Sequence, residues 1–217
     1  MARVQRLAAL LLTMACVMSP QFTLAADGPV KIVVLGDSLS AGYGLPVQSA
    51  FPTKLGQALD AKGIAVAITN AGVSGDTASG GLGRVDWSVP DGTDAVIVEL
   101  GANDALRGID PAVTRTALDG ILKKLKDRKI AVLLAGMYAP RNMGADYARD
   151  FDAIFPALAS AYGTVFYPFF LDGVATDDKL NQRDGLHPNA AGVDVVVGRI
   201  LPKVEELIAR ARTARGS

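Results

Sequence analysis

His187 is the only histidine in the chain, and Asp184 lies three positions before it. Gly185 and Pro188 mark a turn at this point, so the carboxylate of Asp184 can reach back to Nδ1 of the ring. A carboxylate there fixes the tautomer of the imidazole and stabilises the imidazolium that forms when Nε2 accepts a proton. An isolated histidine is more often an ordinary surface or core residue, and it is the nearby Asp184 that favours a general base.

Serine is the nucleophile that fits this base. The single cysteine, Cys16, falls in an N-terminal segment that we expect to be removed, which leaves no thiol in the mature chain. Ser38 follows an apolar run, and its small neighbours Gly36 and Gly42 leave room for a substrate. A helix-capping serine is the structural alternative for Ser38. The chain has no G-x-S-x-G motif, so the nucleophile elbow of the usual α/β-hydrolases is not indicated.

Acyl transfer to a serine also needs hydrogen-bond donors for the oxyanion that develops on the carbonyl. The backbone N–H groups of Ser38 and Gly75 and the side-chain amide of Asn103 are the candidates. Taken singly, Gly75 and Asn103 are better explained by turns, which favour both residue types. We expect Asp37 to be structural, with its carboxylate accepting backbone N–H groups that hold the loop around Ser38.

Short apolar runs alternate with helical patterns along the chain. Strands are predicted at 30–35, 64–69, 95–100, 130–135 and 164–167. Helices are predicted at 51–62, 111–128, 147–162 with an interruption at Pro156, and 190–211 with a bend or split at Pro202. Asp76 and Thr77 resemble the start of a short helix. Residues 209–217 are expected to fray.

Strands that are apolar on both faces and separated by helices predict one α/β domain, residues 27–217, with a parallel sheet covered on two sides. In such sheets ligands bind beyond the carboxyl ends of the strands. Four of the five predicted strand ends lead into small, polar, turn-forming residues. Loops of this kind that leave one edge of a sheet together predict a functional site at that edge.

Composition excludes several classes of function. The chain has 217 residues, half of them hydrophobic and a fifth charged, which is typical of a folded domain. Basic and acidic residues are equal at 22 each, and no basic block is present, so nucleic-acid binding is not indicated. One histidine and one cysteine are too few for a Cys/His metal cage.

Residues 1–26 have the pattern of a secretory signal peptide. Arg3 and Arg6 form a positive end, a short apolar run covers 7–18, and small residues precede a cleavage site near Ala25 or Ala26. An uncleaved anchor helix is the alternative, but the run is shorter than the ~20 residues of a membrane span. We expect a periplasmic or secreted protein without stable membrane insertion after cleavage.

Four blocks occur in a fixed order along the mature chain: GDSL at 36–39, SGDT around Gly75, GAND around Asn103, and DGLHP at 184–188. Together they resemble the blocks of the SGNH hydrolases, the GDSL branch of serine esterases. The longer stretches GDSLSAGYGL and ELGANDALRG are similar to those of secreted bacterial arylesterases and of the related acyl-CoA thioesterase/lysophospholipase proteins. Relatives often have glycine where this chain has Ala102.

The resemblance implies a flavodoxin-like three-layer α/β/α sandwich around a five-stranded parallel sheet. It implies ester hydrolysis without a metal or other cofactor, with Ser38, Asp184 and His187 as catalytic residues. Ser38, Gly75 and Asn103 would form the oxyanion hole. The implied partner is a small-molecule ester.

The substrate class is predicted from a few apolar residues near the same edge of the sheet. An acyl groove could be lined by Leu106, Met137, Tyr138, Ala139 and Pro140. The alternative for the Met and Tyr residues is packing in the core or in a lid. Aryl and short-to-medium acyl esters are expected, with thioesters as a further class. Lysophospholipase or acyl-CoA thioesterase activity, carbohydrate O-deacetylation and a non-enzymatic binding module are the other functions considered.

Overall fold

The computed structural model describes residues 28–216, so the predicted signal segment lies outside the described residues. Its centre is a five-stranded sheet in the order β2-β1-β3-β4-β5, with every neighbouring pair parallel. The strands are β1 (Val30–Gly36), β2 (Val66–Gly72), β3 (Ala95–Glu99), β4 (Ala131–Ala135) and β5 (Val165–Tyr167). This order is that of flavodoxin-like folds, and it confirms the predicted parallel sheet.

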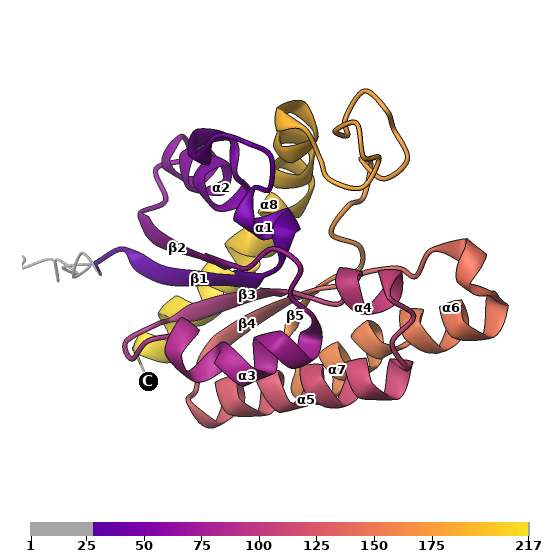
Figure 1. The fold of residues 1–217 in the computed structure, drawn as a ribbon. Helices are drawn as coiled ribbons and strands as arrows, with labels where there is room; N and C mark the ends of the chain where they lie inside the picture. The colour runs from indigo at the N-terminus through magenta and orange to yellow at the C-terminus, as the bar shows by residue number, and fades with distance from the viewer. Residues whose placement is uncertain (1–27, 217) are drawn as a thin grey trace, which may run out of the picture.

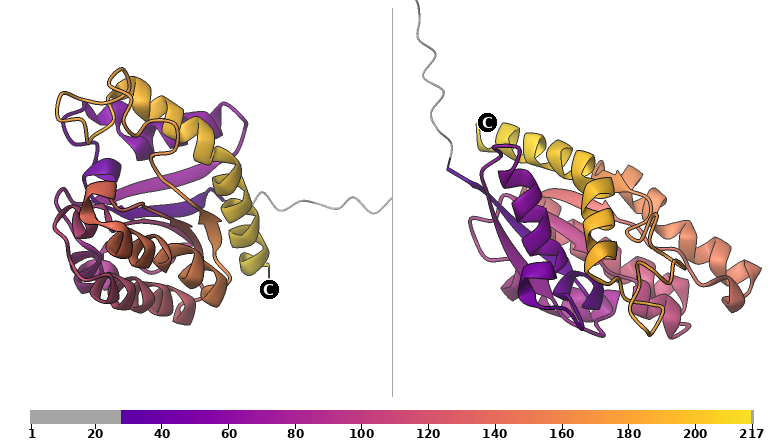
Figure 2. Two further views of the ribbon diagram at one scale, coloured as in Figure 1. Left: turned by 90° about the vertical axis from the view of Figure 1, so that its right-hand side faces the viewer. Right: turned by 90° about the horizontal axis from the view of Figure 1, so that it is seen from above.

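Helices cover both faces of the sheet (Figure 1, Figure 2). On one face α2 (Phe51–Asp60) packs against α8 (Ala190–Arg215). On the other face α5 (Pro111–Asp127) packs between α3 (Ala78–Ser88) and α7 (Ile154–Tyr162). Shorter helices occupy the loops: α1 (Ser38–Ala41), α4 (Ala102–Leu106) and α6 (Ala145–Asp152). The three-layer sandwich is therefore as predicted.

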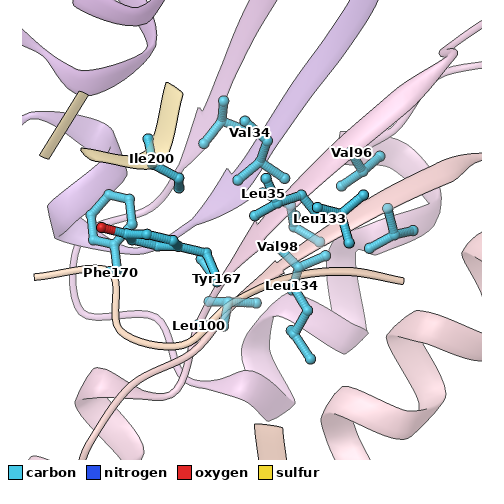
Figure 3. Packing of buried hydrophobic residues seen from close by; sticks show 14 of the residues in the cluster. Val34, Leu35, Val96, Val98, Leu100, Leu133, Leu134, Tyr167, Phe170 and Ile200 are labelled. Atoms are coloured by element: carbon cyan, nitrogen blue, oxygen red, sulfur yellow. The ribbon is translucent and has the colours of Figure 1, made fainter. Parts of the chain in front are cut away.

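The core lies between the sheet and these helices. Because both faces of the sheet are covered, all five residues of β3 are buried, which explains the absence of hydrophobic–polar alternation in its sequence. Figure 3 shows side chains from three neighbouring strands packed together with residues of the covering segments: Val34, Leu35, Val96, Val98, Leu133, Leu134, Phe170 and Ile200.

Several boundaries differ from the sequence-based expectation, two of them for a clear physical reason. Strand β2 begins at Val66 rather than residue 64, because Ile64 N donates to Leu59 O and so caps the end of α2. The predicted helix at 147–162 divides at Ala153, not at Pro156. Pro156 lies in the first turn of α7, where a missing backbone N–H costs no hydrogen bond.

The C-terminal segment was expected to fray from residue 209, but α8 continues to Arg215. Its guanidinium pairs with Asp94, and it donates to Gly28 O and Pro29 O at 2.9 Å each, so the last turn is attached to the start of β1. Pro202 lies inside α8, which remains one helix but is bent along its length (Figure 2).

The register of the sheet decides where the functional loops lie. Gly36 at the end of β1 pairs with Gly72 of β2 and with Glu99 of β3. The loops that follow these strands therefore leave one edge of the sheet side by side. No helix within residues 28–216 is long and apolar enough to cross a membrane.

Candidate active site

The turn that follows β1 presents Ser38 at the edge of the sheet. Asp37 is the N-cap of α1, and its Oδ1 accepts from Leu39 N at 2.9 Å. The helix is only four residues long and ends at Gly42 in the left-handed conformation, with φ of 82°. Ser38 is thus the first residue of the helix rather than its cap, and the structural role considered for it belongs to Asp37.

The structure brings Ser38, His187 and Asp184 into one line of contacts, although Ser38 and His187 are 149 residues apart. Ser38 Oγ lies 2.8 Å from His187 Nε2, and His187 Nδ1 lies 2.7 Å from Asp184 Oδ2. A carboxylate beside Nδ1 places the ring proton there, which leaves Nε2 free to accept the Ser38 hydroxyl proton.

Asp184 is held by backbone as well as by the ring. Its Oδ1 accepts from His187 N at 3.0 Å and from Leu186 N at 2.9 Å. These N–H groups, the His187 N–H first, lower the pKa of the Asp184 carboxyl to about 2. The Asp184 carboxyl is therefore an anion at neutral pH.

Two predicted oxyanion donors, the N–H groups of Ser38 and Gly75, both border the same cavity. Gly75 is in a tight turn closed by Asp76 N to Val73 O at 3.0 Å, and its φ of 82° favours glycine. Arg107 Nη2 donates to Gly75 O at 2.8 Å and fixes this turn. Within the described chain neither of the two N–H groups donates to another residue, so both remain available to a ligand.

The third predicted donor, Asn103, also borders the cavity, but its amide is already engaged. Asn103 Nδ2 donates to Asp37 Oδ2 at 3.0 Å and to Asp76 O at 2.9 Å. An amide NH2 has two hydrogens, so both are used. Donation to an oxyanion would therefore require Asn103 to share or release one of these bonds.

A buried carboxyl that the sequence analysis did not single out lies beneath the turn that carries Ser38. Glu99 is fully buried, and its Oε2 accepts from Ser40 Oγ at 2.7 Å and from Asp37 N at 3.3 Å. A Cβ on Gly36 would come within 2.7 Å of Glu99 Oε2, so the glycine makes room for this carboxyl. The sequence signal was a single acidic residue in an otherwise apolar strand.

The charge state of this carboxyl pair follows from burial. Burial raises the pKa of Glu99 well above its usual value, and the nearby Asp37 charge raises it further. Burial also raises the pKa of Asp37, to about 6. The shift favours the neutral, protonated form of Glu99, which lowers the cost of burying a carboxyl whose Oε1 has no partner among the described residues.

Arg84 completes the buried contacts beneath the site, and sequence reasoning missed it as well. Its Nε lies 2.6 Å from Asp76 Oδ2, and its two terminal nitrogens donate to Ala71 O at 2.8 Å and Gly36 O at 2.9 Å. The side chain therefore ties the ends of β1 and β2 to the Gly75 turn. We refer to Asp37, Ser40, Asp76, Arg84 and Glu99 as the polar floor.

An apolar groove of about 580 Å³ opens beside Ser38 and His187. All five residues predicted from the sequence line it: Leu106, Met137, Tyr138, Ala139 and Pro140. Met137 and Ala139 are buried and belong to the core as well, whereas Leu106 and Tyr138 are about half exposed. Further lining residues that the sequence did not reveal are Tyr43, Phe169, Leu171, Ala175 and Leu186.

Among residues 28–216 no group of three or more His, Cys, Asp or Glu side chains is arranged to hold a metal ion. The chemistry that the site can support with its own side chains is proton transfer between Ser38 and His187, next to two free backbone donors and an apolar surface.

Comparison with known proteins places this geometry in a family. The model of the GDSL-like Lipase/Acylhydrolase family matches residues 34–195. An arylesterase of Vibrio mimicus is 39% identical over 165 residues, which is 76% of this chain and 82% of that protein. The thioesterase 1/protease 1/lysophospholipase L1 of Escherichia coli strain K12 is 34% identical over 187 residues, 86% of this chain and 88% of that protein.

A solved structure agrees with these relatives. The psychrotrophic esterase EstA from Pseudoalteromonas sp., inhibited by monoethylphosphonate, superimposes with a TM-score of 0.78 at 30% identity. The match covers 83% of this chain and 99% of that one. The chain therefore belongs to the GDSL-like lipase/acylhydrolase family, the SGNH hydrolases, and is a carboxylic ester hydrolase.

Proposed function

We propose that this ester hydrolase is an exported serine esterase that cleaves aryl and short-to-medium acyl esters through Ser38, His187 and Asp184. The observation that carries the proposal is the 2.8 Å contact between Ser38 Oγ and His187 Nε2 at the mouth of an apolar groove. A hydroxyl hydrogen-bonded to an oriented imidazole is the arrangement that activates serine as a nucleophile.

In the first step Ser38 Oγ attacks the ester carbonyl while its proton passes to His187 Nε2. Asp184, anionic and bonded to Nδ1, stabilises the imidazolium. The carbonyl oxygen becomes an oxyanion, and the free N–H groups of Ser38 and Gly75 bind it. Asn103 becomes the third donor when one of its two present bonds, to Asp37 or to Asp76 O, is shared with the oxyanion.

The tetrahedral intermediate then collapses, and the bond to the leaving alcohol, phenol or thiol breaks. His187 returns its proton to that leaving group and is neutral again. In the second step water attacks the acyl-Ser38 ester while His187 Nε2 takes a proton from it. The bond between the acyl group and Ser38 Oγ then breaks, His187 returns the proton to Ser38 Oγ, and the acid is released. Asp184 stays ionised throughout, because a pKa of about 2 keeps its carboxyl deprotonated at neutral pH.

The groove supports the proposed substrate class. It is lined mainly by apolar side chains, and Tyr138 stacks on Phe169 with ring centroids 4.7 Å apart. Such a surface suits an acyl chain or an aromatic ring rather than the polar surface of a sugar, which disfavours carbohydrate O-deacetylation. A second candidate is lysophospholipase or thioesterase activity, which the name of the Escherichia coli relative favours.

Export rests on the sequence alone. Residues 1–26 combine a positive end, a short apolar run and small residues at a cleavage site near Ala25 or Ala26, as a secretory signal does. We propose a periplasmic or secreted mature protein that begins near residue 26 or 27. N-terminal sequencing of the exported protein tests this.

The test of the mechanism is a substrate panel with Ser38→Ala as the blank. The panel contains nitrophenyl esters of increasing acyl length, an acyl-CoA and a lysophospholipid. We expect the native chain to prefer the nitrophenyl esters, and Ser38→Ala to lose about 10⁵-fold or more in kcat. A fluorophosphonate probe should label Ser38 in the native chain.

The matched control is Ser160→Ala, an exposed serine on α7, which should keep full activity and full labelling. Normal turnover by Ser38→Ala would refute the serine mechanism. A high rate on lysophospholipid with none on the short esters would instead establish the second candidate.

A further inference from the structure

Gln182 connects the loop that carries His187 to the turn that carries Ser38. Its backbone N donates to His187 O at 2.8 Å. Its side-chain Nε2 donates to Tyr43 O at 2.8 Å and to Pro188 O at 3.0 Å. One glutamine thus binds the backbone carbonyls of His187 and of Pro188, and also reaches a segment 139 positions away.

Tyr43 continues this connection to the nucleophile. Tyr43 N donates to Ser38 O at 3.1 Å, so the residue that Gln182 holds is itself bonded to Ser38. The Tyr43 ring also lies against the His187 ring, with centroids 4.7 Å apart. The contacts therefore close a circuit that runs from Ser38 through Tyr43, Gln182 and His187 back to Ser38.

We propose that Gln182 is a positioning residue that holds His187 Nε2 against Ser38 Oγ by clamping the two loops together. This inference rests on the proposed function of Ser38 and His187. We call Gln182 and Tyr43 the clamp. Tyr43 supplies a backbone carbonyl and a ring, and Gln182 supplies the donors.

The loop needs such a clamp because little regular structure holds it. Within the described chain, the segment between β5 and α8 contains no helix and no strand. A single β-bridge joins Asn181 to Pro188 there. The contact between Asp184 and His187 is internal to this loop, so it orients the ring but does not fix the loop to Ser38. The side chain of Gln182 donates both to Pro188 O, in the loop that carries His187, and to Tyr43 O, in the segment bonded to Ser38.

The chemistry of the contact requires an amide of this length. Both acceptors are carbonyl oxygens, so the side chain must supply two hydrogens, which an NH2 group does. A carboxylate of the same shape would face two carbonyls with acceptors only. Gly44 makes room for the amide, since a Cβ there would come within 2.3 Å of Gln182 Oε1.

Gln182 is not among the residues that line the groove, so it is not placed to bind substrate. The loss of Gln182 should therefore lower kcat and leave KM unchanged. A raised KM at constant kcat marks the loss of an interaction that holds the substrate equally in the ground state and the transition state, and Gln182 is not placed to make one. Displacement of a reacting group by 1 Å can cost ~10²-fold, so a loosened rather than broken contact should cost about tenfold in kcat.

The experiment compares Gln182→Met, which keeps the length but cannot donate, and Gln182→Glu with the native chain. The exposed Gln57→Ala on α2 is the control. Steady-state kinetics on a nitrophenyl ester give kcat and KM. Because His187 is the only histidine, ring-¹⁵N histidine labelling reports one imidazole by NMR. A thermal melt checks the fold.

We expect kcat to fall about tenfold in both Gln182 variants with KM changed by less than about twofold. The Nε2 resonance should shift or broaden, because its contact to Ser38 loosens. The Nδ1 resonance should stay, because Asp184 is in the same loop. Gly44→Ala, which displaces the amide, should reproduce the loss of kcat if Gln182→Met fails to fold.

An unchanged kcat, an unchanged Nε2 resonance, or a rise in KM at constant kcat would each overturn the proposal. Ser38→Ala is assayed beside these variants. If Ser38→Ala remains active, the serine mechanism fails. If Ser38→Ala is inactive and Gln182→Met is as active as the native chain, only the role of the clamp fails.

Discussion

The polar floor and the rim of the groove both adjoin the turn that carries Ser38, and they are built differently. In the floor, Glu99 and Asp37 are fully buried, and each is held by directional hydrogen bonds. At the rim, Leu106, Tyr138 and Leu186 are 49%, 42% and 48% exposed. The proposed nucleophile thus rests on buried, hydrogen-bonded groups, whereas the proposed substrate groove is bordered by exposed side chains, and we expect changes to cost more in the floor than at the rim.

The largest expected effect is the loss of Arg84 from the floor. Arg84→Met removes the ion-pair partner of Asp76 and one hydrogen bond each from the carbonyls of Gly36 and Ala71, and the side chains of the Arg84–Asp76 pair are only 8% and 12% exposed. Removing one member of a buried pair costs about 3–5 kcal/mol of unfolding free energy. Urea unfolding measures the loss.

The matched control is Lys124→Met, which breaks the pair with Asp86, whose side chains are 44% and 70% exposed. An exposed pair contributes less than about 1 kcal/mol. Equal losses of unfolding free energy in Arg84→Met and Lys124→Met would contradict the comparison of floor and surface, because the buried pair would then contribute no more than the exposed one.

The next effect is the pH dependence that Glu99 imposes on stability. Its pKa is raised in the folded protein, so above the usual value of 4.5 the folded chain keeps a proton that the unfolded chain releases. The unfolding free energy then falls as pH rises, by at most about 1.4 kcal/mol per pH unit. Glu99→Gln removes that slope, and it should gain stability relative to the native chain as pH rises from 4 to 7.

Asp37, with its pKa raised to about 6, also makes the unfolding free energy fall as pH rises, and it does so both in the native chain and in Glu99→Gln. The control is Glu206→Gln. Lys203 and Arg210 lower the pKa of Glu206, so its stabilising contribution is present at neutral pH and lost in acid. A difference between Glu99→Gln and the native chain that stays constant from pH 4 to pH 7 would show that Glu99 is ionised in both states.

The smallest effect is expected at the rim. Leu106→Ala shortens an exposed wall of the groove and should weaken the binding of longer acyl chains. Each methylene group that the wall no longer covers loses ~0.8 kcal/mol of binding free energy, which corresponds to about a fourfold loss of affinity. Stability should change by no more than about 0.5 kcal/mol. The ratio of kcat/KM for long and short nitrophenyl esters measures the preference. Val47→Ala, 80% exposed and outside the groove, should leave that ratio unchanged.

The sequence predicts the fold well where burial determines the pattern. The apolar runs at β1 and β3 are readable because both faces of those strands are covered. The break at Ala153 could not be read, because proline is tolerated in the first turn of a helix and so Pro156 marks the start of α7 rather than its end. Helix α3 is rich in glycine, so only its Thr77 cap was visible in the sequence.

The candidate site divides in the same way. Asp184 and His187 are three positions apart, so a turn alone brings them together. Gln182, by contrast, meets Tyr43 through a contact that only the folded chain defines. Arg84 lies in a helix whose pattern does not indicate which charged side chain turns inward. The side chains that we propose to react could be picked out from the sequence, whereas those that support them depend on tertiary packing.

The attachment of Arg215 to the backbone of Gly28 and Pro29 has a consequence for engineering. It brings the end of α8 beside residues 28 and 29, at the end of the sheet where β1 begins (Figure 1). A short linker between them would give a circular chain, which could be reopened at the exposed turn around Gly63. In such a permutant β1, with the turn that carries Ser38 at its end, becomes an internal segment of the chain.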